Sequence, residues 1–487
     1  MLGAIQYKRR QPEKSLLYQV VQDNIGPFIR ARAREGKDLP RYVIKEFEEY
    51  LRCGRLEHGL VRIWCEGCKH ELAVALSCKK RGFCPSCCGK RMVETAAHLV
   101  DNVLPIAPYR QWVLTLPVPL RFWCATNRKL AAKVHRIIIR NIEDHYISMA
   151  KRSGVQDPEP GSITFVQHFG SALQFNLHYH ILFLDGVFSE SGKKFSAAEK
   201  LQDQQVEVVL AAIAEQIIKL CRKRGFISED PDQVQSGEMD SLFGESSALS
   251  AALSASIKGK IAFGPRAGKN VRFIGEGFGF QEEIPLAKGN LCYSQNGFSI
   301  HAATQVHDYD RPRLEKLIKY ISRPPVAMHR LSKAGGGLLQ YKLKTPFRDG
   351  KTHVLLSPEE LLEKLTAIIP RPRSHNTKYS GVFAPHHPLR ETVTIRPEMK
   401  KGFESPKDKD GDGKKQKKNY TWSQLLARSF KIDLTKCPHC GGELRVLKPI
   451  MARDQIDRYL KHQGLLEHPP PNSPTLTDNI SYEPILD

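Results

Sequence analysis

Long apolar runs are absent from this sequence of 487 residues. The opening segment, MLGAIQYKRRQPEK, holds no apolar stretch long enough for a signal peptide. No run elsewhere approaches the roughly 18 apolar residues that a membrane span needs. We therefore expect no membrane partner and a reducing, cytoplasmic environment. There the 12 cysteines would be metal ligands or core residues rather than disulfides.

Acidic side chains are scarce beside basic ones: 52 Asp and Glu stand against 74 Lys and Arg, a surplus of 22 positive charges. Such a surplus favours a polyanionic partner, because neutralising phosphates releases condensed counterions. A basic protein without such a partner is the alternative. A phosphate-binding loop is also missing, since the nearest match, at 264–270, has the wrong spacing and no Ser or Thr after its lysine. We therefore expect no built-in helicase.

Helical and strand-like periodicities occur together along the chain, which predicts an α+β fold. The clearest strand-like runs are 162–169, 175–184 and 297–306, and a capped helix is expected at 311–322. We expect a helical and zinc-binding domain over 1–105, a core over 106–330 with an insertion at about 227–260, the end of the core over 331–399, a charged linker over 400–419, and a small module over 420–487.

Two cysteine pairs of the form C-x2-C occur near the N-terminus, Cys65 with Cys68 and Cys84 with Cys87. Each pair can present two sulfurs from one tight turn, so the two pairs together predict four thiolates around one tetrahedral zinc ion. A basic module of this kind usually binds nucleic acid, although a purely structural role is an alternative.

Other cysteines near these pairs admit a second zinc ion. Its ligands would be Cys53, His58, Cys78 and His98. The alternative is that the extra cysteines, Cys88 among them, are small buried apolar residues. A further pair, Cys437 with Cys440, resembles half of a zinc ribbon that lacks two ligands; His462 is a candidate for one, and a turn with reduced thiols is the alternative.

Two histidines, His178 and His180, lie in the strand-like run at 175–184. Alternate residues of a strand point to one face, so their imidazoles can share a cation, which the same spacing on a helix would prevent. A hard divalent ion also needs oxygen ligands. We favour Gln167, because a hairpin would bring 162–169 alongside 177–184; Asp185 and His301 are alternatives.

The expected helix at 311–322 carries Tyr320 on its rim. Asp310 can cap this helix and Pro324 can end it. Tyr320 lies about 110° around the helix from the centre of the apolar stripe. A phenol there could attack a phosphodiester, with nearby cations holding DNA and stabilising the phenolate. Those cations are Lys316, Lys319 and Arg323. The alternative is a tyrosine that only packs at the boundary of the core.

Several segments together resemble the HUH-type rolling-circle transposases of the insertion-sequence-ninety-one family. The matching segments cover most of the chain from about 45 to 465. They are SCKKRGFCPSC, RQWVLTLPVPLR, ITFVQHFGSALQFNLHYHILFLDGVF, GFSIHAATQV, LEKLIKYISRPPVA, THVLLSPEELLEKLTAIIPRPR, KYSGVFAPHHPLR and CPHCGGELRV.

The resemblance implies an antiparallel sheet with flanking helices, preceded by an N-terminal zinc-binding domain for DNA. It implies a metal site at His178 and His180, which we expect to take Mg²⁺ or Mn²⁺, and a catalytic tyrosine at Tyr320. Tyr320 would form a 5′-phosphotyrosine link with single-stranded or hairpin DNA at element ends. Many relatives pair two tyrosines one helical turn apart, whereas this chain has Lys316 at the second position and would be a single-tyrosine variant.

Functions other than transposition stay open at the level of sequence. A plasmid replication initiator or relaxase would use the same chemistry, and a zinc-finger regulator would bind DNA without cutting it. A metal-dependent hydrolase would use water instead of a tyrosine. Rolling-circle transposition further implies host replication or helicase proteins as partners and association with the bacterial nucleoid.

Overall fold

The computed structural model describes residues 10–227, 246–275, 289–347, 349–394, 437 and 439–465. The predicted linker at 400–419 and residues 228–245 of the predicted insertion lie outside this part of the chain. Within it, no helix combines the length and the apolar character that crossing a membrane requires.

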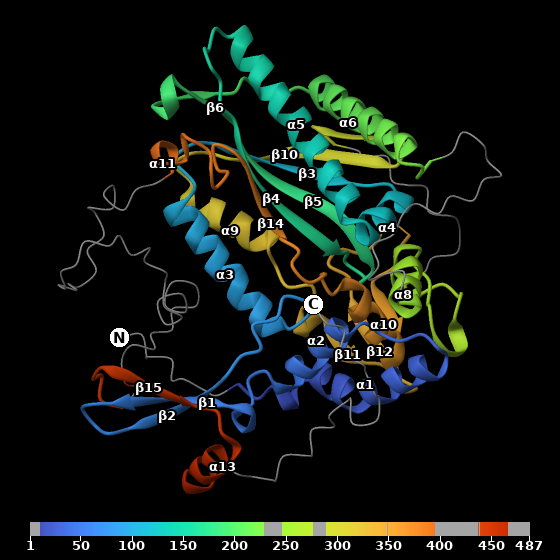
Figure 1. Cartoon of the computed structure of the whole chain (residues 1–487), viewed down its shortest axis with the longest axis vertical. Helices are drawn as coiled ribbons and strands as arrows, with labels where there is room; N and C mark the ends of the chain where they lie inside the picture. The colour runs from blue at the N-terminus through green and yellow to red at the C-terminus, as the bar shows by residue number, and fades with distance from the viewer. Residues whose placement is uncertain are drawn as a thin grey trace.

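A six-stranded antiparallel sheet forms the centre of the molecule (Figure 1). Its strands, in spatial order, are β14 (Thr377–Gly381), β4 (Gly161–Phe169), β5 (Phe175–Leu184), β3 (Tyr109–Thr115), β10 (Phe298–Val306) and β9 (Cys292–Gln295). The predicted strands at 162–169, 175–184 and 297–306 are therefore confirmed. Because β5 is paired on both edges, its position is fixed by two hydrogen-bond ladders.

Helices cover both faces of this sheet, as Figure 1 shows. The odd-numbered residues of β5, Tyr179 among them, are buried in one cluster with apolar residues of α5 (Arg128–Arg152) and α6 (Asp203–Lys223). Leu182 and Leu184 belong to a second cluster, with apolar residues of α3 (Pro85–Asn102) and α9 (Arg311–Ile321). The alternation of the strand thus sends even-numbered residues towards α3 and α9, and the expected α+β fold is confirmed.

The remaining larger elements gather at one end of the central sheet. The helices are α1 (Leu16–Arg34), α2 (Arg41–Arg52), α4 (Val118–Thr126), α8 (Ser247–Ile257) and α10 (Pro358–Ile368), and the second sheet holds β11 (Leu331–Lys333), β12 (Leu339–Lys342), β13 (His353–Leu356) and β8 (Arg272–Ile274). Helix α8 lies in the predicted insertion, yet Leu249 and Leu253 are buried in the main core. This part of the segment is therefore integral to the fold.

Shorter elements complete the described chain. Strands β6 (Gly186–Ser189) and β7 (Lys194–Ala197) form a hairpin. The short helices are η1 (Pro12–Lys14), η2 (Leu56–His58), η3 (Glu190–Gly192), η4 (Gly264–Arg266), η5 (Met328–Arg330) and α11 (Arg390–Val393).

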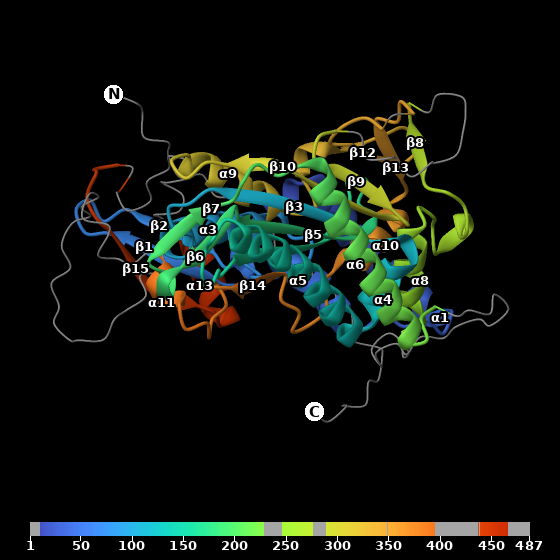
Figure 2. The same cartoon turned by 90° about the horizontal axis from the view of Figure 1, so that it is seen from above.

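A three-stranded sheet joins the two ends of the described chain. Its order is β15 (Leu444–Ile450), β1 (Leu60–Cys65) and β2 (Glu71–Ala75), and α13 (Arg453–His462) packs beside it. Figure 2 shows this sheet at one end of the molecule and β8, β12 and β13 at the other. The module expected at 420–487 is therefore not separate, because β15 pairs with a strand of the N-terminal domain.

Candidate active site and metal centres

The two histidines of β5 lie side by side on the face that α9 covers. The ring centroids of His178 and His180 are 5.0 Å apart. In register, His178 lies opposite Gln167 of β4 and Thr115 of β3, and His180 lies opposite Phe165 and Val113. The sheet thus places both imidazoles on one surface, as their spacing predicts.

Hydrogen bonds at Nδ1 orient both rings. His178 Nδ1 is 2.8 Å from the carbonyl oxygen of Asn176. A carbonyl only accepts, so Nδ1 carries the proton and Nε2 keeps its lone pair. His180 Nδ1 is 2.7 Å from the side-chain amide of Gln111 on β3. The Gln111 atom at this distance is Nε2, which donates. With the amide turned over, its oxygen would accept from Nδ1 and leave Nε2 of His180 as a free ligand; an orienting contact at Nδ1 is typical of histidines that bind metals.

Both rings are neutral at neutral pH. Burial lowers the pKa of His178 to about 4 and that of His180 to about 2. Nearby positive charge on Arg323 contributes to both of these pKa shifts. Neutral imidazole is the form that binds a metal ion, so the environment of the pair suits a cation more than a second proton.

Gln167 supplies an oxygen beside the histidine pair. Its amide nitrogen donates to the carbonyl oxygen of Ile321 at the end of α9, which fixes the orientation of the amide because the carbonyl cannot donate. The opposite atom, Oε1, is buried and has no hydrogen-bond partner. An unpartnered buried oxygen next to two imidazoles fits a third ligand for a divalent ion.

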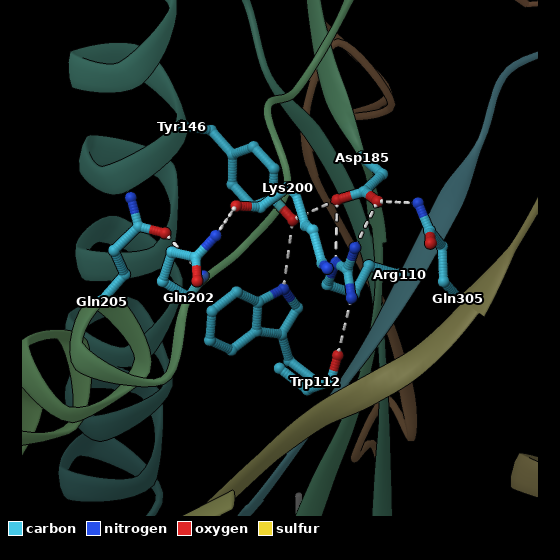
Figure 3. A network of polar contacts seen from close by, with 9 residues as sticks. Arg110, Trp112, Tyr146, Asp185, Lys200, Gln202, Gln205 and Gln305 are labelled. Carbon is cyan, nitrogen blue, oxygen red and sulfur yellow. Dashed lines mark hydrogen bonds and ion pairs between the residues drawn. The ribbon is translucent and has the colours of Figure 1, made fainter. Parts of the chain in front are cut away.

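The other candidate ligands of the sequence do not join the pair. Asp185 is buried and accepts from Arg110, Tyr146 and Gln305 at 2.7–2.9 Å (Figure 3). This network engages both of its carboxylate oxygens, so Asp185 is structural. Within the described part of the chain, no third His, Cys, Asp or Glu, His301 included, brings a ligand atom to the histidine pair.

Tyr320 lies against His180. Their ring centroids are 6.5 Å apart at an interplanar angle of 84°, and the tyrosine side chain is 40% exposed. Helix α9 begins after Asp310, whose side chain accepts from the backbone of Arg313 as predicted. Leu314, Ile318 and Ile321 are buried under the helix, which leaves Tyr320 at the edge of the histidine pair.

Two cations lie next to Tyr320, Lys344 at its hydroxyl and Arg323 over its ring. Lys344 Nζ donates to Tyr320 Oη at 2.6 Å, and the charge of Arg323 lies 4.8 Å from the ring centroid. Partial burial of the ring opposes ionisation, but the hydrogen bond from Lys344 and the charge of Arg323 outweigh it. The pKa of Tyr320 is therefore below its usual value. This environment favours a phenolate, which is the nucleophilic form of the side chain.

The other predicted DNA-binding cations of α9 differ in their surroundings. Lys316 is exposed, whereas Lys319 Nζ forms an ion pair with Glu315 at 2.7 Å. Arg323 also lies over the ring of Phe169 at 5.8 Å. Only Arg323 among these three therefore contacts the tyrosine itself.

A cleft opens beside the histidine pair, between α3, β4 and the end of α9. Gln167 and Arg323 form the wall nearest the pair, and Arg81 and Arg91 line the side that belongs to the cysteine-rich segment. Phe169 also borders the cleft, but it is only 9% exposed and Arg323 lies over its ring. The guanidinium groups suit the phosphates of a nucleic acid strand.

Four cysteines near the N-terminus form one group, in which three are buried and Cys78 is half-buried. Cys53, Cys78, Cys84 and Cys87 have ligand atoms within 4.8 Å of one another. Three of their Sγ separations are 3.4–3.6 Å, close to the roughly 3.8 Å expected between thiolates bound at 2.3 Å to a tetrahedral zinc ion. The donor set therefore fits zinc.

A second group consists of Cys65, Cys68, Cys437 and Cys440. The prediction that Cys65 and Cys68 share a zinc ion with Cys84 and Cys87 is therefore wrong. Strand β1 carries Cys65 away from Cys84 and towards the C-terminal pair, because β15, which follows that pair, places Leu444 opposite Cys65.

The predicted histidine ligands are wrong as well. His98 is exposed on α3 and contacts Asn102, His462 is exposed at the end of α13, and neither they nor His58 belong to a group. Cys88 lies outside both groups and is buried against Gly82, as the alternative interpretation of the extra cysteines expects.

Sequence patterns do not reveal Gln111 or Lys344. Gln111 is one more polar residue in the strand β3, and only pairing with β5 places it beside His180. Lys344 follows β12 and contacts Tyr320 of α9. No local sequence motif marks this contact.

Comparisons with known proteins agree on one family. A family model described as "Putative transposase" matches residues 161–390, and one described as "Transposase zinc-binding domain" matches residues 23–116. The latter range includes the whole first cysteine group, which supports a structural zinc ion there. No solved structure matches the chain.

One curated relative is the transposase for insertion sequence element IS801 from Pseudomonas savastanoi pv. phaseolicola. It is 29% identical to this chain over 154 residues, which are 31% of this chain and 35% of that protein. The matched region thus spans about a third of the length of this relative.

Proposed function

Because the chain belongs to the insertion-sequence-ninety-one family of transposases, we propose that it nicks and rejoins single-stranded DNA during rolling-circle transposition. The nucleophile is Tyr320, and a divalent ion binds at His178, His180 and Gln167. The observation that carries the proposal is the contact of the Tyr320 ring with His180, because it brings a phenol beside two imidazoles whose ring centroids are 5.0 Å apart.

The chain's own residues prepare the nucleophile. Lys344 and Arg323 stabilise the Tyr320 phenolate by a hydrogen bond and by charge. Its oxygen attacks the scissile phosphorus in line, a new bond between Tyr320 Oη and phosphorus forms, and the bond to the 3′-oxygen breaks. The departing oxygen takes up a proton and becomes a free 3′-hydroxyl. When bound, Mg²⁺ or Mn²⁺ supplies Lewis acidity that withdraws charge from the phosphate.

Joining is the reverse of this step. The phosphotyrosine keeps the energy of the original phosphodiester, so a later 3′-hydroxyl can attack it and release Tyr320 without ATP. The hydroxyl of Tyr320 is the only one on α9 (RPRLEKLIKYI), and Lys316 stands one turn before it. We propose that Tyr320 acts in both cleavages, or that a second copy of the chain contributes the other tyrosine.

The substrate is a single strand. A flexible single strand can bend its backbone to Tyr320, which lies against the sheet at His180, more readily than a stiff duplex can. The cleft next to Gln167 offers Arg81, Arg91 and Arg323 to phosphates. The strand would therefore run from the histidine pair towards the cysteine-rich segment.

A gel assay of covalent adducts tests the proposal. Labelled single-stranded DNA from both ends of the element that encodes the chain is incubated with Mn²⁺ or with a chelator. The expected result is an adduct that resists SDS, requires the metal and disappears in Tyr320→Phe. Tyr309→Phe is the matched control, because Tyr309 is 79% exposed just before the same helix and its loss should leave the adduct intact.

Other results would favour other functions. Cleavage without an adduct would indicate a hydrolase that uses water. Binding without cleavage, on DNA known to contain the correct ends, would indicate a DNA-binding regulator. Nicking and joining without transfer to a new site would indicate a replication initiator or a relaxase.

A further inference from the structure

We propose that Cys65, Cys68, Cys437 and Cys440 hold a second zinc ion, which fastens β15 and α13 to the N-terminal domain. This site is independent of the proposed nicking chemistry. It differs from the zinc site in the first cysteine group, with which it shares no ligand. Its ligands come from segments 369 residues apart.

The positions of the four sulfurs support a shared ion. Cys65 Sγ is 3.4 Å from Cys440 Sγ, and Cys68 Sγ is 3.5 Å from Cys437 Sγ. All four lie within 4.8 Å of one another. Thiolates on a tetrahedral zinc ion are about 3.8 Å apart, so only small adjustments would complete the coordination.

Each cysteine pair lies in a tight turn of the kind that presents two sulfurs to one ion. In the first turn, Lys69 N donates to Cys65 O at 3.0 Å; in the second, Gly441 N donates to Cys437 O at 2.9 Å. The amide of Gly442 also approaches Cys440 Sγ at 3.4 Å. Backbone donors of this kind stabilise a bound thiolate.

Glycines leave room for the sulfurs. A Cβ atom at Gly67 would lie 3.3 Å from Cys440 Sγ, and one at Gly442 would lie 3.2 Å from the same sulfur and 3.4 Å from Cys65 Sγ. These contacts are tighter than a side chain normally allows. The absence of a side chain at both positions therefore lets the two turns approach each other closely.

The three-stranded sheet also has too small an apolar core to be stable by itself. Its apolar cluster has four buried members, Leu56, Leu60, Ile456 and Leu460. A unit with so small a core usually depends on a metal or on disulfides. Four cysteine ligands fill a tetrahedral site completely, so this ion would be structural and would have no open position for substrate.

The number of zinc ions per chain tests the proposal. Elemental analysis of the full chain, purified without chelator under reducing conditions, should find two zinc ions, and Cys437→Ser with Cys440→Ser should reduce the number to one. Cys84→Ser with Cys87→Ser should also leave one, at the other site. Cys292→Ser is the matched control, because Cys292 belongs to neither group, and it should retain two. A single zinc ion in the wild type, or two in the Cys437 and Cys440 variant, would overturn the proposal.

A second measurement does not depend on a cysteine variant that folds. A protease site is inserted between residues 410 and 411 of the otherwise unchanged chain, and the chain is then cleaved. The C-terminal fragment should remain bound in size-exclusion chromatography and separate only after a zinc chelator is added. Separation with zinc present, or continued binding after zinc has been removed, would contradict the fastening role.

Discussion

The six-stranded sheet and the three-stranded sheet of this molecule are stabilised in different ways. The first has apolar clusters on both faces, with α5 and α6 on one side and α3 and α9 on the other. The second has four buried apolar residues. It lies next to the second cysteine group, Cys65, Cys68, Cys437 and Cys440. This difference matches the two roles that we propose for metal, catalysis at the large sheet and folding at the small one.

The largest expected effect separates these two uses of metal. Replacing both histidines, His178→Ala with His180→Ala, should lower the rate of adduct formation by about 1,000-fold or more, since a catalytic ion contributes several kcal/mol. Zinc content and stability should hardly change. Adduct kinetics and elemental analysis measure the two properties, with the exposed His386→Ala as control. A loss of zinc in the double variant would contradict the proposal that the histidines and the cysteines bind different metal ions.

Removal of zinc should destabilise the three-stranded sheet and leave the six-stranded sheet intact. A strong zinc chelator should speed hydrogen exchange in β1 and β15 by about 100-fold or more, because coordination energy is folding energy in such a module. Amides of β5 should keep their protection, since β5 is paired on both edges. Hydrogen exchange with mass spectrometry resolves the two regions. Equal loss of protection in both sheets would contradict the distinction.

The contact between Gln111 and His180 should matter for metal affinity alone. Gln111→Ala should weaken Mn²⁺ binding by about 10- to 100-fold, the usual cost of losing a residue that orients a ligand. Calorimetric titration of Mn²⁺ measures the affinity. Gln216→Ala is the control, because Gln216 is exposed on α6. Unchanged affinity in Gln111→Ala would exclude the orienting role.

The smallest expected effect concerns the nucleophile. Lys344→Met removes a hydrogen bond that lowers the pKa of Tyr320, so that pKa should rise and the phenolate fraction at a given pH should fall. Adduct formation should slow about tenfold near neutral pH and recover as the pH is raised. The pH dependence of the rate checks this sign, with Lys333→Met as control, because Lys333 is exposed on β11. A uniform loss at every pH would indicate that Lys344 only positions the ring.

Local periodicity was sufficient to predict the strand β5 and the helix α9, because side-chain direction in both depends on a few neighbouring residues. His178, His180 and Tyr320 could therefore be identified together with the faces that they occupy. Gln167 could be proposed from the expected hairpin, although its bond to Ile321 could not.

The cysteine groups could not be assigned from spacing. The nearest C-x2-C pairs in the sequence, at Cys65 and Cys84, contribute to different groups, because β1 and β2 separate them in space. The partner of Cys65 lies 375 residues away. Such long-range pairing depends on how strands β1 and β15 meet, which no local pattern records.

The meeting of β1 and β15 also sets an order of events during synthesis. A ribosome adds about 5–20 residues per second, so the 369 residues between Cys68 and Cys437 take about 20–70 seconds to make. During that interval β1 lacks its neighbour β15, and the thiols of Cys65 and Cys68 lack those of Cys437 and Cys440. All strands of the six-stranded sheet, the last of them β14, are translated before β15 can complete the three-stranded sheet.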